Sequence, residues 1–132
     1  MSFQSINSKY IYSELSHSII GSCFDVQNSL GSGRPEKTYQ KALAYELHSR
    51  KINFSEQVVT DLKYKDIRIG NRRFEFLVDN KIIVELKVGN FLGKSEFEQI
   101  FEYLQMSGIK LGLLILFSTS GVKIKRIINL ES

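Results

Sequence analysis

Two glutamates and a lysine in the middle of the chain have the residue types and spacing of a hydrolytic metal site. Glu85 and Lys87 flank Leu86 in a stretch, 82–88, that predicts a β-strand. Side chains alternate along a strand, so Glu85 and Lys87 should face one side while Leu86 faces the core. Glu75 lies ten residues earlier, in the preceding predicted strand. A hairpin would therefore bring two carboxylates and one ammonium group together.

These groups together suit the hydrolysis of a phosphate ester. Two carboxylates can hold a hard divalent cation such as Mg²⁺ or Mn²⁺ through oxygen ligands. The metal polarises a phosphoryl oxygen and acidifies its bound water. A lysine beside it can position that water or stabilise the charge that builds on phosphorus. The alternative is an ordinary surface strand with a Glu–Lys cross-strand pattern, because Glu-x-Lys is a common tripeptide.

The length of the hairpin loop decides whether this site can form. A two-residue loop would place Glu75 and Glu85 on opposite faces, because a one-residue slip turns every side chain over. A three-residue loop, 79–81, pairs Val78 with Ile82 and sets Glu75 opposite Glu85. We predict the three-residue loop or a compensating bulge. The residues that would then share the buried face are Phe74, Phe76, Val78, Val84 and Leu86.

Hydrophobic periodicity predicts the elements that position the site. A helical period marks three helices, and a period of two or a continuous apolar run marks five strands. The helices are 8–30, 35–51 and 95–106, and the strands are 58–64, 73–78, 82–88, 111–118 and 122–130. The apolar residues at helical spacing, expected to face the core, are Ile11, Leu15, Ile19, Phe24 and Leu30 in the first helix and Phe97, Ile100, Phe101 and Leu104 in the third. Gly70-Asn71 predicts a tight turn between the first two strands. The order α-α-β-β-β-α-β-β predicts an α/β fold with a mixed central sheet flanked by helices.

Length and composition favour one small domain, 1–132, with a nucleic-acid partner. The single cysteine excludes an internal disulfide, and no signal segment or apolar membrane span is evident, so we expect a cytoplasmic protein with no membrane contact. The formal net charge is +4, which favours a polyanion. Arg72 and Arg73 belong to a basic cluster beside the hairpin and are candidate phosphate contacts. The alternative is that each is an ordinary solvated strand residue.

Several motifs together resemble the PD-(D/E)xK nuclease superfamily. Glu75 and Glu85-Leu86-Lys87 look like its core motif. The stretch 30–39 resembles the signature of the GxxExxY proteins, small bacterial members of that superfamily, with Gly33, Glu36 and Tyr39 at the signature positions. The family usually has aspartate where this chain has Glu75, which keeps the carboxylate and adds one methylene.

The resemblance implies a restriction-endonuclease-like core and roles for further residues. Glu36 would complete the metal site, although a first-turn glutamate can instead simply complement the helix dipole. Gln99 and Tyr103 resemble the Gln-x-x-x-Tyr motif of the exonuclease branch, where both orient the site and the nucleic-acid backbone. The expected function is a Mg²⁺- or Mn²⁺-dependent nuclease acting on DNA or RNA. The alternatives are a non-catalytic nucleic-acid-binding module, and a homodimer or subunit of a larger complex that retains the fold.

Overall fold

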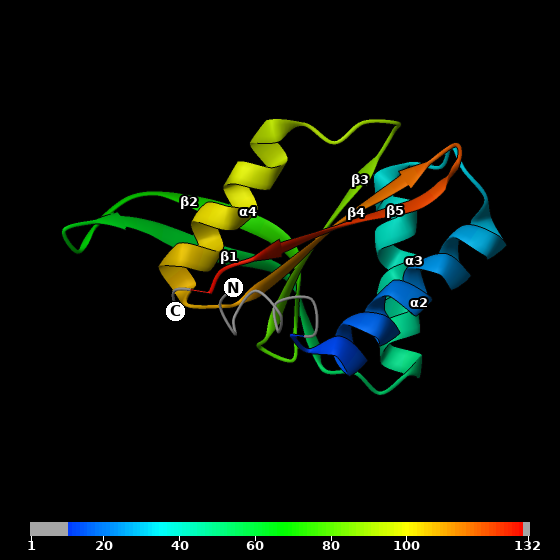
Figure 1. Ribbon diagram of the computed structural model, residues 1–132, viewed down its shortest axis with the longest axis horizontal. Helices are drawn as coiled ribbons and strands as arrows, with labels where there is room; N and C mark the ends of the chain where they lie inside the picture. Colours follow the sequence, from blue (N-terminus) through cyan, green and yellow to red (C-terminus); the bar gives the residue numbers. More distant parts are fainter. Residues whose placement is uncertain (1–10, 131–132) are drawn as a thin grey trace, which may run out of the picture.

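The computed structural model describes residues 11–130, and its elements follow the expected order (Figure 1). The helices are α2 (Ser13–Leu30), α3 (Glu36–Ser49) and α4 (Lys94–Ser107), and the strands are β1 (Phe54–Tyr64), β2 (Ile67–Val78), β3 (Ile82–Val88), β4 (Leu111–Ser118) and β5 (Gly121–Ile128). The predicted order α-α-β-β-β-α-β-β is confirmed. Of the helices in this described part, none has the length and hydrophobicity that crossing a bilayer requires.

The five strands form one mixed sheet in the order β1-β2-β3-β4-β5. The β3–β4 pair is parallel and the other pairs are antiparallel. The parallel pair is joined through α4, as parallel strands require a crossover connection. β3 is the middle strand, so Glu85 and Lys87 lie at the centre of the sheet, as expected.

The two faces of the sheet are covered unequally. On one face, α2 and α3 bury Ile19, Cys23, Leu43 and other apolar side chains against Val84 and its neighbours. The other face carries only α4, which packs on a second apolar cluster built from the following residues: Phe74, Ile83, Ile100, Tyr103, Leu104, Leu114 and Ile127. α4 approaches β4 closely because Gly112 has no side chain, since a Cβ there would stand 2.6 Å from Ile100 Cγ2.

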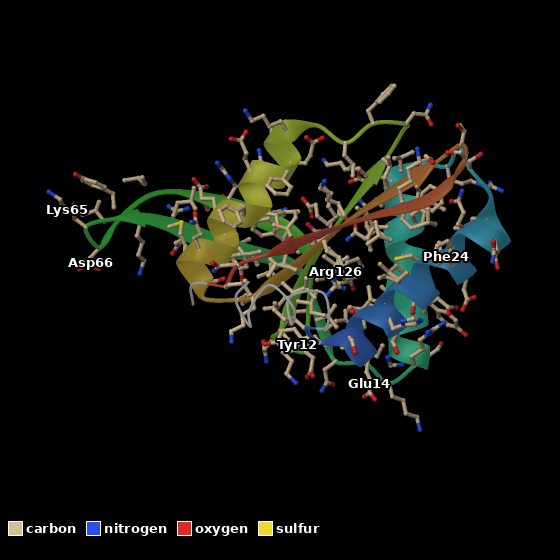
Figure 2. The ribbon with its side chains drawn as sticks, viewed as in Figure 1. Tyr12, Glu14, Phe24, Lys65, Asp66 and Arg126 are labelled. Atoms are coloured by element: carbon tan, nitrogen blue, oxygen red, sulfur yellow. The ribbon has the colours of Figure 1, made fainter. Side chains whose placement is uncertain are left out.

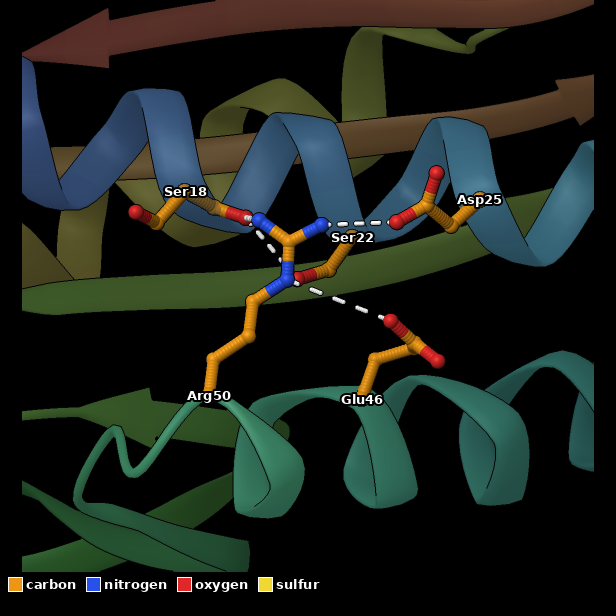
Figure 3. Close-up of polar contacts among 5 residues, drawn as sticks. All are labelled: Ser18, Ser22, Asp25, Glu46 and Arg50. Atoms are coloured by element: carbon orange, nitrogen blue, oxygen red, sulfur yellow. Dashed lines mark hydrogen bonds and ion pairs between the residues drawn. The ribbon is translucent and has the colours of Figure 1, made fainter.

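Arg50 joins the two helices of the heavily covered face (Figure 3). Its guanidinium donates to the Ser18 carbonyl at 3.1 Å and to Asp25 Oδ2 at 2.7 Å. Glu46 lies one turn earlier on α3, 3.9 Å from Arg50 Nε. The end of α3 is therefore tied to the middle of α2 by polar contacts as well as by apolar packing.

The β1–β2 hairpin extends away from the rest of the molecule, and its turn is not where the sequence predicted it (Figures 1 and 2). Lys65 and Asp66 form the turn, both with positive φ. Gly70 and Asn71 instead lie within β2 and pair with β1. The prediction of a Gly70-Asn71 turn is wrong because long strand pairing overrode a local preference, while Asp tolerates the left-handed conformation a tight turn needs.

The first helix also differs in detail from its prediction. It begins at Ser13, and the predicted residues 8–10 lie outside the described part of the chain. Phe24, expected on the apolar face, is 45% exposed and points outward (Figure 2). The buried side of α2 consists of Ile19, Cys23 and Val26 with the two serines Ser16 and Ser22.

Candidate functional site

The candidate site lies where β2 separates from β3. The β2–β3 ladder holds only three residue pairs, Val78–Ile82, Leu77–Ile83 and Phe76–Val84, whereas β3 stays paired with β4 along its full length to Val88. The predicted three-residue loop and the Val78–Ile82 pairing are confirmed. Glu75 and Glu85 are the next residues after the last pair. They therefore occupy the fork between two diverging strands.

The two glutamate side chains replace the backbone hydrogen bonds that the fork loses. The Glu75 N–H donates to Glu85 Oε1 at 3.0 Å, and the Leu86 N–H donates to Glu75 Oε2 at 2.9 Å. A buried backbone N–H must find a partner, so these two carboxylates stabilise the fork. Each glutamate side chain accepts a hydrogen bond from the backbone of the other strand, and these two bonds fix the pair side by side.

Glu36 reaches the same fork from the first turn of α3. Its carboxyl group hydrogen-bonds that of Glu75, and its negative charge acts on Glu85 as well. Two carboxyl groups can share such a bond only when one of them carries a proton. The structure therefore gathers three carboxyl groups from α3, β2 and β3 at one point.

Tyr39 fixes the loop that delivers Glu36. The buried Tyr39 ring stacks on Phe117 of β4, with centroids 4.3 Å apart and planes 10° from parallel. Its hydroxyl donates to the Gly31 carbonyl at 2.6 Å and accepts from the Arg34 N–H at 3.3 Å. Gly33 lies in this loop with φ +85°, a conformation that favours glycine. The Gly33–Glu36–Tyr39 spacing thus shapes the entry to α3.

The fork shifts the protonation of its carboxyl groups. Burial, the hydrogen bond to Glu36 and the nearby Glu85 charge raise the pKa of Glu75 to about 9. Burial raises the pKa of Glu85 to about 7. The hydrogen bond from the Glu75 N–H and the charge of Lys87 act in the opposite direction and lower it. Like charges gathered in a partly buried place disfavour ionisation. A cation at the fork would favour the deprotonated forms of both groups.

Lys87 lies on the Glu85 side of β3. The pKa of Glu96, in the first turn of α4, is lowered mainly by hydrogen bonds from its own backbone N–H and from Ser95. The charge of Lys87 lowers it further. Lys87 is therefore electrostatically coupled to both Glu85 and the start of α4.

The remaining four predicted residues make other contacts. Tyr103 is 4% exposed and its ring packs 4.7 Å from that of Phe74. Gln99 is exposed one turn earlier on α4. Arg72 faces α4, 3.6 Å from Glu102, and its Nε is buried without a hydrogen-bond partner in the described chain. Arg73 is exposed on the opposite face of β2. The interactions at the fork link Glu36, Glu75, Glu85 and Lys87, and none of those described includes these four residues.

One part of the predicted apolar pattern is wrong at the fork. Phe74 was expected to share a buried face with Phe76 and Val78, but it lies in the α4-side cluster while they lie on the α2/α3 side. The facing strand bends here, since Gln57, between the partners of Phe74 and Phe76, has φ +52°. A regular strand cannot send residues two apart to opposite faces, so the alternation is interrupted at Glu75.

The chemistry of the cluster fits a hard divalent cation. All donors are carboxylate oxygens, which Mg²⁺ and Mn²⁺ prefer, and a cation would offset the burial and the like-charge repulsion that raise both pKa values. In residues 11–130, no three His, Cys, Asp or Glu side chains are already placed as a ligand set. Glu75 and Glu85 each give one oxygen to a backbone N–H, so binding would engage their second oxygens with local reorientation.

The fold and this carboxyl cluster define a small α/β protein with an acidic site at the centre of a mixed sheet. Residues 13–127 match the family model of the PD-(D/E)XK nuclease superfamily, and the chain belongs to that superfamily. The chain is also similar in fold to a solved structure titled "Crystal structure of SSO0001", with a TM-score of 0.54 and 15% identity over 70% of this chain. This chain spans about half of that one, 49%. No curated protein matches this chain in sequence.

Proposed function

We propose that this protein is a divalent-metal-dependent nuclease that hydrolyses phosphodiester bonds of DNA or RNA. Glu75, Glu85 and Glu36 would hold Mg²⁺ or Mn²⁺. The observation that carries the proposal is the convergence of these three carboxyl groups at the fork, with raised pKa values for Glu75 and Glu85. Stability alone would not favour such clustering. Membership of a nuclease superfamily supports the reaction class.

A bound divalent ion would polarise a phosphoryl oxygen and make its water more acidic. Lys87 would position the attacking water and stabilise the charge that develops on phosphorus. Water adds to phosphorus as the bond to the leaving oxygen breaks, and that oxygen gains a proton. Gln99 and Tyr103 would hold the geometry near the phosphate, Tyr103 through its packing on Phe74. Arg72 and Arg73 would contact phosphates of the strand.

A titration of Mn²⁺ and Mg²⁺ with mixed DNA and RNA substrates tests the proposal. Wild-type protein should cleave in a metal-dependent way. Lys87→Ala should lose cleavage at least about a hundredfold while keeping most nucleic-acid affinity, because its charge acts on the transition state more than on the bound substrate. Lys41→Ala, which removes an exposed lysine from α3, is the matched control and should cleave normally.

Metal binding is measured separately by calorimetry or Mn²⁺ relaxation. The ion should bind weakly without nucleic acid, because such sites rely on water and substrate phosphates for further ligands. A Glu75→Ala/Glu85→Ala double variant should lose this binding, while Glu14→Ala, an exposed glutamate on α2, should not. Equal binding by wild type and the double variant would remove the fork from the mechanism.

A second candidate function is a non-catalytic nucleic-acid-binding module, alone or as a subunit of a larger complex. Two observations favour it. Both glutamates already serve the fold by accepting the Glu75 and Leu86 N–H groups, and Glu75 stands where the family resemblance implies an aspartate. Salt-dependent binding of nucleic acid, with no cleavage at any metal concentration, would select this function over the first.

A further inference from the structure

A cleft opens on the α4 side of the sheet, next to the carboxyl cluster. Its volume is about 460 Å³, and it is lined by Leu92, Gly93, Lys94, Phe97, Leu114 and Lys125. These residues come from the loop after β3, the first turn of α4, and strands β4 and β5. Figure 1 shows that loop carrying the chain from the arrowhead of β3 to the start of α4. The sequence placed Phe97 in the core, but it is 36% exposed at this cleft.

The sheet register connects the cleft to the candidate site. Glu85 pairs with Leu114 across β3 and β4, and Leu114 pairs with Lys125 across β4 and β5. Paired residues share a face of the sheet, so Glu85, Leu114 and Lys125 form one row. Neighbouring strands are about 4.8 Å apart, so Lys125 stands roughly 10 Å from Glu85 along this row. Lys87 and Lys123 belong to the next row, on either side of Leu116.

The side chains of the cleft combine an aromatic surface with cations. Lys125 Nζ lies 5.9 Å from the centroid of the Phe97 ring, and Phe97 stacks on Phe101 at 6.4 Å. Lys94 adds a second ammonium group at the rim. The nearby Glu96 carboxylate is turned to Ser95 Oγ at 3.0 Å and interacts with Lys87. An aromatic face beside lysines is the combination that binds unpaired nucleotides, since bases stack on the ring and phosphates meet the cations.

We propose that this cleft holds an unpaired nucleotide of a single-stranded nucleic acid, with its base on Phe97 and a neighbouring phosphate at Lys125. The proposal rests on the nuclease function proposed above and names its substrate class. A paired base within a duplex has its faces covered by its neighbours and cannot stack on Phe97. The cleft therefore selects single strands, or the single-stranded ends of duplexes, for delivery to Glu85 and Lys87.

The test measures binding of a labelled oligothymidylate and of a blunt duplex by fluorescence anisotropy in EDTA, where no cleavage can occur. Wild type should prefer the single strand. Phe97→Ala should weaken single-strand binding about tenfold, the effect of losing one stacked base, and Phe97→Trp should restore it. Lys125→Ala should lower the slope of log affinity against log salt by about 0.7, one phosphate contact. Duplex binding should change little in all three.

Matched controls are Phe24→Ala and Lys41→Ala, which remove an exposed aromatic and an exposed lysine from the far side of the sheet. Thermal unfolding confirms that each variant is folded. The cleft proposal is overturned if Phe97→Ala and Lys125→Ala bind the single strand as tightly as wild type does. It is also overturned if wild type binds single strand and duplex with equal affinity, or binds neither.

The two proposals fail separately. If Phe97→Ala cleaves with Mn²⁺ as fast as wild type does, the cleft proposal is wrong and the nuclease proposal is retained. If single-strand binding requires Phe97 but no cleavage occurs at any metal concentration, the nuclease proposal is wrong and the cleft proposal is retained.

Discussion

The two faces of the central sheet differ in what covers them and in what they leave exposed. Two helices, α2 and α3, close one face with buried apolar side chains and the Arg50 contacts to Ser18 and Asp25. A single helix, α4, covers part of the other face and leaves a cleft with exposed lysines and Phe97. The first face should therefore supply most of the stability, and the second should supply the contacts to a ligand.

The fork at Glu75 and Glu85 is where the two faces meet. Glu36 arrives from the helix of the closed face, while Glu85 belongs to the row that continues into the open cleft. Such an arrangement separates two tasks that often conflict, because a well-packed core and a site with clustered charges place opposite demands on stability. Substitutions on the two faces should consequently affect different measurements.

The largest expected effect is a loss of stability on the closed face. Leu43→Ala should lower the free energy of unfolding by about 2–5 kcal/mol, because Leu43 is fully buried and its removal leaves a cavity. Leu92→Ala, at the half-buried cleft, should cost under about 1.5 kcal/mol. Urea denaturation measures both, and equal losses would contradict the division between the two faces.

The second expected effect is a pH dependence that arises at the fork. Both glutamates have pKa values raised in the folded protein, Glu85 to about 7 and Glu75 to about 9. The folded state therefore binds more protons than the unfolded chain, and stability falls as pH rises from about 5 to 9. At about 1.4 kcal/mol per pKa unit, discounted for partial solvent access, we expect a loss of about 2 kcal/mol.

Thermal unfolding at several pH values checks this prediction. A Glu75→Gln/Glu85→Gln double variant should give a flatter profile between pH 5 and 9. Added Mg²⁺ or Mn²⁺ should restore wild-type stability at the alkaline end, because the ion binds the deprotonated groups. A stability that stays constant or rises over this range in wild type would show that folding does not raise the pKa values of these carboxyl groups.

The third expected effect compares a buried tyrosine on each face. Tyr39→Phe should lower the free energy of unfolding by about 1 kcal/mol, because the Gly31 carbonyl and the Arg34 N–H lose their shared partner. Within the described chain, the Tyr103 hydroxyl makes no hydrogen bond, so Tyr103→Phe should change stability by less than about 0.5 kcal/mol. Denaturation and Mn²⁺ affinity are measured for both. Only Tyr39→Phe should weaken the binding of Mn²⁺, because it loosens the loop before Glu36.

The sequence predicted the elements and the hairpin register well because both rest on periodic patterns. Val78 and Ile82 flank a loop whose length is constrained by the face that each side chain must occupy. The fork itself was not predictable from such patterns. It depends on Gln57 breaking the strand alternation and on carboxylates accepting the Glu75 and Leu86 N–H groups, which are properties of three-dimensional packing and leave no periodic trace.

The cleft was also not predictable from the sequence. Phe97 has helical spacing with Ile100 and Leu104, so the pattern placed it in the core, but the apolar cluster that buries those two residues does not include Phe97. Lys125 belongs to an alternating strand, and only the pairing with Leu114 places it in the row of Glu85. Contacts between elements far apart in the chain decide the position of both residues.

The smallest expected effect compares one ion pair on each face. Arg72 lies 3.6 Å from Glu102 on the α4 side, and Arg50 lies 2.7 Å from Asp25 on the α2/α3 side (Figure 3). Glu102→Gln and Asp25→Asn each raise the formal net charge by one, so any difference between them reports position and not total charge. Both carboxylates are about half exposed, at 49% and 56% of the side chain, so each pair should contribute under about 1 kcal/mol.

If Arg72 contacts phosphates, Glu102→Gln should strengthen binding of an oligonucleotide two- to fivefold, because it releases the arginine from a competing carboxylate. It should change the free energy of unfolding by less than about 0.5 kcal/mol. Asp25→Asn should do the reverse: it should cost up to about 1 kcal/mol, through the short bond to Arg50, and leave affinity unchanged. Anisotropy at a fixed, stated salt concentration and urea denaturation measure the two quantities. Equal gains in affinity from both variants would mean that net charge alone attracts the nucleic acid and that Arg72 is not a contact. The open face would then keep only its cleft as a candidate binding surface.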